Sequence, residues 1–141
     1  MTGMKMTLVA AALSLAYAGP LFAADDASKA EKQRIEQDAK AAKEKCKDMK
    51  GNAKDICMAE ANGQEKVAKA ELAAKQKDTP KNRYDVAAAK ADADYGVAKE
   101  KCDDMKGKDK EACQKDAKAA RDSAKKQAKG ERESAEKAKK A

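Results

Sequence analysis

Apolar and small residues in this chain recur at a spacing of alternately four and three positions. This spacing places side chains along one stripe of an α-helix and is typical of helices that pack together as in a coiled coil. Because most of the positions are alanine, we expect the helices to pack closely while burying little surface. The stripe occurs twice, at Ile35, Ala39, Ala42, Cys46 and Met49 and again at Tyr84, Ala88, Ala91, Tyr95, Ala98, Cys102 and Met105.

Both stripes end in a duplicated segment. Residues 42–57 and 98–113 lie 56 positions apart and are identical at 11 of 16 aligned residues, including two cysteines, a methionine and a glycine. Matched residues at fixed spacing indicate an internal repeat. Each copy is expected to form one supersecondary unit.

A bend is predicted in the middle of each copy. Gly51 and Gly107 are suited to end a helix as left-handed C′ residues, because glycine has no Cβ to clash. Asn52 in the first copy and Asp109 in the second are expected to cap the helix that follows. Each copy therefore predicts two helices joined by a tight turn.

The four cysteines flank these bends, eleven residues apart within each copy. At about 1.5 Å per residue, each lies roughly 8 Å along its arm from the bend, so a hairpin can bring the two together. We predict the disulfides Cys46–Cys57 and Cys102–Cys113, each contributing roughly 3 kcal/mol. The same spacing also fits one face of a straight helix, whose cysteines would bond between chains or stay reduced, and the spacing leaves that alternative open.

The two copies are separated by Asp78-Thr79-Pro80, in which Thr79 is a predicted N-cap and Pro80 the first helical residue. Ala, Lys, Glu and Gln dominate the remaining chain and favour helix, whereas β-branched residues are few. The predicted fold is all-α, with two tandem coiled-coil-like helical hairpins, each stapled by a disulfide. They span residues 24–78 and 79–130, and residues 131–141 form a basic helical or frayed tail.

The N-terminus has the three parts of a secretory signal peptide. Lys5 supplies positive charge, Leu8 to Tyr17 is an apolar run, and Gly19-Pro20 leads to a cleavage site after Ala23, with Ala18 as a poorer candidate. A membrane anchor would need roughly 20 apolar residues. We expect residues 1–23 to be removed and the mature protein to reach the periplasm without a transmembrane segment. That compartment permits disulfides.

The composition of the mature chain argues against catalysis. Histidine is absent, so the usual acid–base, triad and zinc-hydrolase arrangements are missing, and we expect no catalytic residue, no cofactor and no metal. The sharpest alternative is a Cu(I) site built from soft sulfur ligands. Its candidates are Cys46, Met49, Cys57, Met58, Cys102, Met105 and Cys113.

Positive charge is concentrated near the C-terminus. Residues 24–114 hold 21 basic and 20 acidic side chains, whereas residues 115–141 hold 10 and 5. A basic helix of this kind can bind an anionic envelope surface, although a solvated face without a partner fits equally well. Export argues against nucleic acid as the partner. The candidate binding residues are Lys115, Lys118, Arg121, Lys125, Lys126 and Lys129.

The segments GNAKDIC in residues 41–57 and ADADYGVAKEKCDDMKG in residues 91–113 carry a resemblance. The chain resembles small exported Ala/Lys-rich proteins of Gram-negative bacteria with paired-cysteine repeats, which have no known function and are sometimes labelled TolA-like cell-envelope proteins. The expected function is a non-enzymatic periplasmic helical protein with a structural, interaction or stress-related role. Its expected partner is an envelope protein or an anionic envelope surface, and self-association through the helices is a further option.

Overall fold

The structure is a computed structural model and describes residues 21–140. Residues 1–20 of the predicted signal peptide lie outside the described part. The described chain forms helices joined by short turns and contains no strand, which confirms the all-α prediction. The helices are α1 (Leu21–Cys46), α2 (Gly51–Gln76), α3 (Pro80–Cys102) and α4 (Gly107–Ala138).

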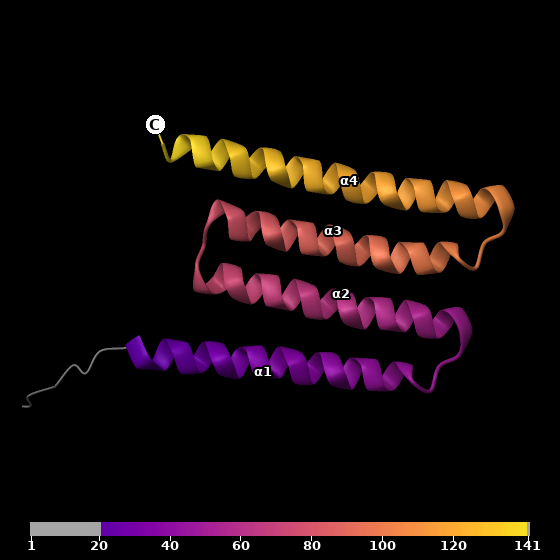
Figure 1. Cartoon of the computed structure of the whole chain (residues 1–141), viewed down its shortest axis with the longest axis horizontal. Helices are drawn as coiled ribbons and strands as arrows, with labels where there is room; N and C mark the ends of the chain where they lie inside the picture. The colour runs from indigo at the N-terminus through magenta and orange to yellow at the C-terminus, as the bar shows by residue number, and fades with distance from the viewer. Residues whose placement is uncertain (1–20, 141) are drawn as a thin grey trace, which may run out of the picture.

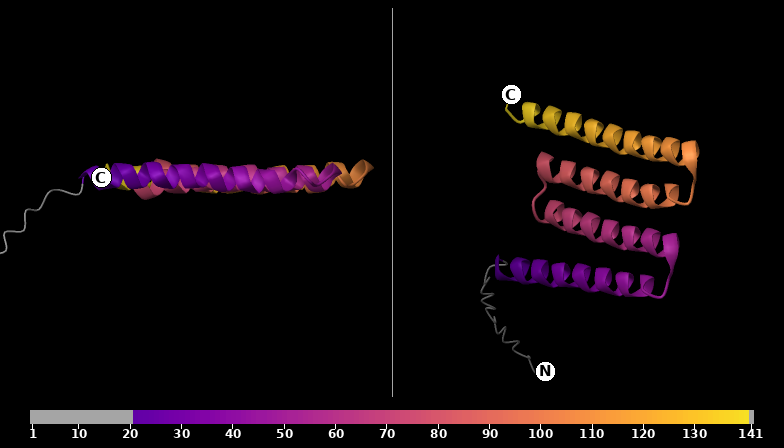
Figure 2. Two further views of the ribbon diagram at one scale, coloured as in Figure 1. Left: turned by 90° about the horizontal axis from the view of Figure 1, so that it is seen from below. Right: turned by 45° about the vertical axis from the view of Figure 1, so that its right-hand side comes forward.

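The four helices lie side by side in a single layer (Figure 1). Within the described residues, α1 contacts α2, α2 contacts α3 and α3 contacts α4, and no other pair of helices meets. Viewed from its edge, the layer is one helix thick (Figure 2). Because α4 does not return to α1, the two hairpins form an open sheet of helices and not a closed four-helix bundle.

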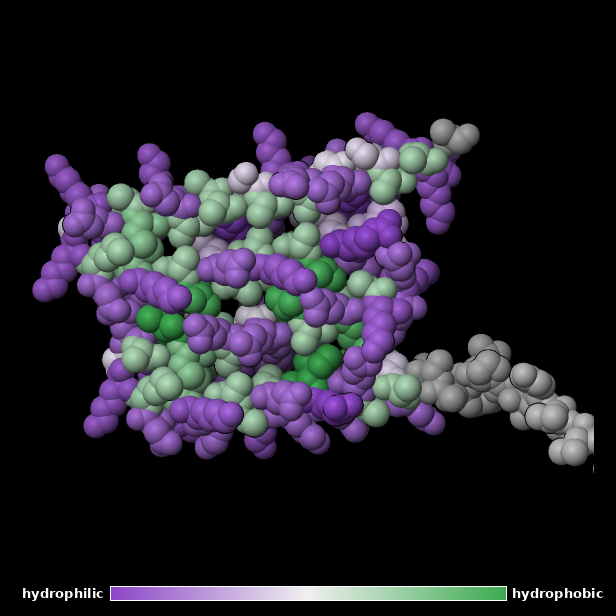
Figure 3. Space-filling model, turned by 180° about the vertical axis from the view of Figure 1, so that it is seen from behind, coloured by the Kyte–Doolittle hydropathy of each residue, from purple (hydrophilic) through white to green (hydrophobic). Residues whose placement is uncertain are grey.

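A layer one helix thick has very little interior. Among the described residues no charged or polar side chain is buried, and Leu72 is the only large aliphatic side chain that is. On the face shown in Figure 3, strongly hydrophobic atoms form small separate patches between charged side chains. Helix propensity, ion pairs and covalent links must therefore supply an unusual share of the stability. The buried side chains are Ala39, Cys46, Ala61, Leu72, Ala91, Cys102 and Ala128.

Within each hairpin, the line of contact between the two helices, called the seam below, is formed by residues of the predicted stripe. Ala39 and Cys46 are buried on α1, and Ala91 and Cys102 are buried on α3, on the stripe whose Tyr84 and Tyr95 meet arginines of α4. Alanine at positions 39 and 91 lets the helices approach closely at these two points. The four-three spacing therefore predicted which face of α1 and α3 each partner covers.

The sequence pattern does not predict the seam between the two hairpins, where α2 meets α3. An ideal Cβ placed on Gly63 of α2 would lie 2.7 Å from the Cβ of Ala93 on α3, so the helices meet where only hydrogen fits. On an α-helix, the residues seven positions before and four positions after Gly63 lie on the same face as Gly63, and the same holds for Ala93. On both helices these residues are β-branched and half-buried: Ile56 and Val67 on α2, and Val86 and Val97 on α3.

The turn between α2 and α3 follows the sequence prediction. Thr79 is the N-cap of α3, its Oγ1 accepts a hydrogen bond from the backbone N–H of Asn82 at 3.0 Å, and Pro80 is the first helical residue. The Asn82 side-chain amide also donates to the carbonyl oxygen of Lys77 at 2.7 Å. These bonds satisfy backbone groups that the two helix ends would otherwise leave unpaired.

The predicted details of the other two turns were wrong. Gly51 and Gly107 do adopt the left-handed conformation, with φ of 57° and 54°, but each begins the following helix instead of ending the preceding one. The N-cap residues are Lys50 and Lys106, and neither makes a side-chain cap. Asn52 instead donates from its side-chain amide to the backbone oxygen of Glu100 on α3 at 2.7 Å. Asn52 therefore joins the two hairpins.

Candidate functional site

Two disulfides close one end of the layer. Cys46 is bonded to Cys57 and Cys102 to Cys113, with Cα atoms 5.6 Å apart in both pairs. The hairpin pairing is therefore the one that the structure contains, and no free cysteine remains among the described residues. Cys46 and Cys102 are completely buried, so each bridge is covered on its N-terminal side.

Each bridge adjoins an exposed methionine in the loop that follows. The backbone N–H groups of Met49 and Met105 donate to the carbonyl oxygens of Cys46 and Cys102 at 3.1 and 3.0 Å. Met49 and Met105 are 43% and 46% exposed. Their interpretation as seam-filling residues was wrong, because α1 and α3 end before reaching them. The two loops lie at the same end of the molecule (Figure 1).

The seam between α3 and α4 is held by two arginine–tyrosine stacks. The guanidinium carbon of Arg121 lies 4.3 Å from the ring centre of Tyr95, and that of Arg132 lies 4.9 Å from the ring centre of Tyr84. Such cation–π contacts contribute about 0.5–1 kcal/mol each when partly exposed. Tyr84 and Tyr95 are eleven residues apart, as are Arg121 and Arg132, so the shared spacing in the sequence could have revealed both pairs.

The first hairpin replaces these stacks with polar contacts at the equivalent positions. Fifty-six residues before Tyr84 and Arg132 stand Ser28 and Gln76, whose side chains are hydrogen bonded to each other. The residue equivalent to Arg121 is Glu65, which accepts hydrogen bonds from Lys43 and Lys69, both at 2.6 Å. The two repeats therefore form the same helical hairpin, but different side-chain contacts join the helices in each.

Glu65 is the most strongly perturbed titratable group in the layer. Hydrogen bonds from Lys43 and then from Lys69 lower the pKa of its carboxyl from 4.5 to about 2, against the opposing effect of partial burial. Because folding lowers this pKa, the ionised carboxylate stabilises the fold fully above about pH 4.5. That stabilisation is lost as the pH falls towards 2.

We expect Glu65→Gln to lower the free energy of unfolding at pH 6. Between pH 4.5 and pH 2, that free energy should decrease less in the variant than in the unchanged protein. The neutral amide keeps the shape of the side chain but has no proton to gain. Urea unfolding at pH 6 and pH 2.5, followed by circular dichroism, measures both effects. Glu60→Gln, on an exposed α2 position, is the matched control. An unchanged pH dependence in Glu65→Gln would contradict the assignment.

The six predicted anion-binding residues divide into two groups. Arg121 and Lys125 turn towards α3, where the Lys125 Nζ lies 3.0 Å from a carboxylate oxygen of Asp92. These two residues support the α3–α4 seam. The other four are exposed along α4 and are called the lysine row below: Lys115, Lys118, Lys126 and Lys129.

The lysine row keeps most of its charge uncompensated. Lys129 lies 3.9 Å from Glu133, but no ion pair joins the other three lysines to any described residue. Of the acidic residues beside the row, Asp122 is paired with Arg121 at 2.8 Å, whereas Glu111 and Asp116 are exposed and form no ion pair with a described residue. An anion approaching α4 would therefore meet exposed lysines, most of them outside ion pairs, with the unpaired carboxylates of Glu111 and Asp116 nearby.

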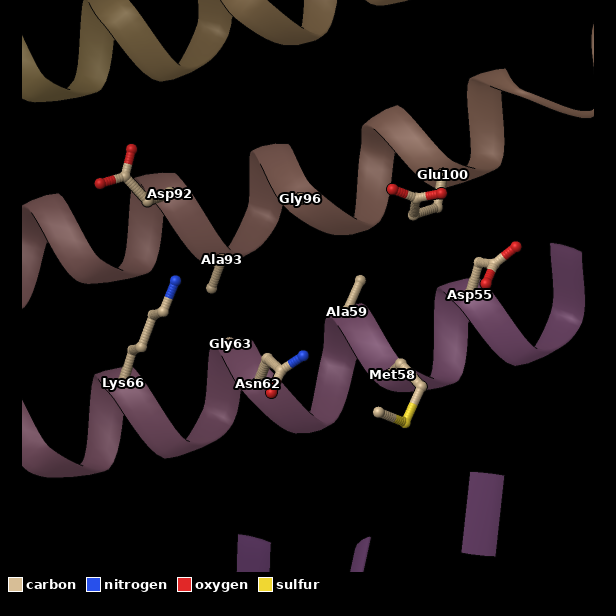
Figure 4. A pocket seen from close by; sticks show the side chains of 10 residues that line it. All are labelled: Asp55, Met58, Ala59, Asn62, Gly63, Lys66, Asp92, Ala93, Gly96 and Glu100. Carbon is tan, nitrogen blue, oxygen red and sulfur yellow. The ribbon is translucent and has the colours of Figure 1, made fainter. Parts of the chain in front are cut away.

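A shallow hollow lies on each face of the α2–α3 seam, on either side of the Gly63–Ala93 contact. One is lined by Asp55, Met58 and Asn62 from α2 and by carboxylates from α3, and the Lys66 side chain points towards α3 (Figure 4). Both hollows are open to solvent. In the described chain, no group of three or more Cys, Asp or Glu side chains is placed to hold a metal ion.

The oxidised cysteines also bear on the copper alternative. In both bridges the sulfur atoms are bonded to each other and not present as thiolates, which are the form that binds soft metals. A copper site built from these cysteines would first require the bridges to open.

Comparison of the chain with protein families, with characterised proteins and with solved structures found no match. Within residues 21–140, no helix combines the length and the apolar character that crossing a membrane requires.

Proposed function

We propose that this chain is an exported, non-catalytic interaction or spacer protein of the cell envelope. The observation that carries the proposal is the single layer of helices, which leaves two broad polar faces open and buries almost nothing between them. Such a layer offers extended surface for contacts and little enclosed space in which to perturb reactive groups. The resemblance to small exported proteins with paired cysteines points to the same compartment.

Export to the periplasm is supported by the two disulfides. Structural disulfides form and persist in oxidising compartments and are rare where thiols are kept reduced. Both bridges lie within repeats of one chain, so they require no partner to form. Residues 1–23 have the features of a signal peptide, which would direct the chain to export.

The test is the intact mass and non-reducing peptide map of the full-length chain expressed in a Gram-negative host and separated into periplasmic and cytoplasmic fractions. We expect periplasmic protein cleaved after Ala23, with Cys46–Cys57 and Cys102–Cys113 closed. Protein that keeps residues 1–23 and four free thiols would overturn the proposal. An Ala23→Leu variant is the control, since a large residue at the cleavage site should retain the precursor.

A second candidate function is attachment to an anionic envelope surface through the lysine row. The observation that favours it is that Lys115, Lys118 and Lys126 are exposed on α4 and form no ion pair with a described residue. α4 has no apolar face that would insert into a bilayer, so binding would rest on charge. It would then weaken as salt screens that charge.

Changing all four lysines of the row to glutamine is expected to weaken binding to vesicles rich in anionic lipid by at least about tenfold, because each lysine near such a surface contributes about 1 kcal/mol. Co-sedimentation at 50 and 300 mM salt measures the effect. The matched control removes four exposed lysines from α1 instead: Lys29, Lys32, Lys40 and Lys45. Equal losses in the two variants would show that net charge, and not the lysine row, determines binding.

A further inference from the structure

The two loops after the bridges present the most accessible sulfur in the described chain. Met49 and Met105 are its only exposed large hydrophobic side chains. Each stands three residues after a buried cysteine, in a loop that the other repeat reproduces. Nearly half of the surface of each residue is therefore open to solvent at equivalent positions of the two repeats.

The remaining sulfur atoms are less available to an oxidant. The four cysteines are already oxidised as disulfides. Met58 is half-buried on α2, where it lines the hollow beside Asn62 (Figure 4). Thioethers in exposed loops are therefore the first sulfur atoms that an electrophilic oxidant meets.

Oxidation at these two positions would spare the fold. Sulfoxide formation turns an apolar side chain into a polar one, which disrupts packing when the side chain is buried. Met49 and Met105 lie outside the helices, and the hydrogen bonds that order their loops come from the backbone N–H groups. Their side chains can become polar without opening a seam.

We propose that Met49 and Met105 are paired modification sites that take up oxygen from two-electron oxidants such as hypochlorous acid. The thioether sulfur attacks the electrophilic chlorine, and water then replaces chloride at sulfur. The thioether and hypochlorous acid thus yield the sulfoxide, chloride and one proton. Sulfur loses two electrons and chlorine gains them, so no further reactant is required. The inference is independent of the binding function proposed for α4.

The experiment treats the disulfide-bonded chain with one to ten equivalents of hypochlorous acid and follows each methionine by peptide mapping with fragment-ion assignment. We expect Met49 and Met105 to be converted at least about threefold faster than Met58, because accessible thioethers react first. The helical circular dichroism signal and both disulfides should persist while these two residues convert. Conversion of Met58 at an equal rate, or helix loss in step with oxidation, would overturn the proposal.

The variant Met49→Leu/Met105→Leu separates the two sites from the rest of the chain. Both positions are exposed, so leucine is expected to leave the thermal transition unchanged. Oxidant consumption at low equivalents should fall to the level set by the other residues. The control Met58→Leu should consume nearly as much oxidant as the unchanged protein. The reverse ranking of the two variants would also overturn the proposal.

Discussion

Replacing Cys46 and Cys57 with alanine is expected to lower the free energy of unfolding by about 3 kcal/mol, the value that loop-closure entropy gives for a bridge of this span. The loss is large for a layer that buries mainly alanine between its helices. Because α2 is the only helix of the described chain that α1 contacts, the effect should concentrate on α1. Hydrogen exchange is expected to show α1 losing protection while α3 and α4 keep theirs.

The equivalent change at Cys102 and Cys113 is the matched comparison. The Tyr84–Arg132 and Tyr95–Arg121 stacks hold that seam independently of its bridge. We therefore expect α4 to keep more protection without its disulfide than α1 keeps without its own. Urea unfolding gives the global loss for both variants. Unchanged stability after either substitution would contradict the role assigned to the bridges.

Gly63→Ala is expected to destabilise the protein by about 1–3 kcal/mol relative to Gly96→Ala, because overpacking a close contact forces backbone shifts. The new Cβ would lie 2.7 Å from the Cβ of Ala93 and 3.2 Å from its Cα, and neither atom can move without its helix. A Cβ on Gly96 meets nothing within 4 Å. Gly96→Ala should therefore gain about 0.5–1 kcal/mol from helix propensity alone.

The double variant Gly63→Ala/Ala93→Gly tests whether the contact itself is responsible. Removing the Ala93 methyl group removes the 2.7 Å contact and leaves the 3.2 Å contact with the Ala93 Cα, so the double variant should be more stable than the additive sum of the two single changes. Thermal and urea unfolding of all four combinations give the coupling energy. Strict additivity would contradict a direct clash between α2 and α3.

The helices and both hairpins could be predicted from the sequence because their signals are local. The four-three stripe placed Ala39 and Ala91 in the seams, and Thr79-Pro80 placed the start of α3. The cysteine pairing followed from a bend between two residues eleven apart, although the straight-helix alternative had to be excluded by the structure. These inferences concern residues within one or two turns of each other or in the same repeat.

The parts that the sequence left undetermined depend on long-range packing. Nothing local shows that Gly63 meets Ala93, because glycine within a helix usually signals only a lower helix propensity. The six candidate anion-binding residues looked equivalent until Arg121 and Lys125 were seen to turn towards α3. Met49 and Met105 continued the stripe in sequence, but the helices end before reaching them.

The β-branched residues that line the contact between α2 and α3 have no counterparts on the two outer helices, α1 and α4. Fifty-six residues after Ile56 and Val67 of α2, α4 carries Ala112 and Ser123. Likewise, Ala30 and Ala41 of α1 stand fifty-six residues before Val86 and Val97 of α3. In helical repeat proteins, terminal repeats need a polar outer face for solubility. Alanine and serine at these exposed positions leave the outer edges of α1 and α4 with less apolar surface for a further helix than α2 and α3 offer each other.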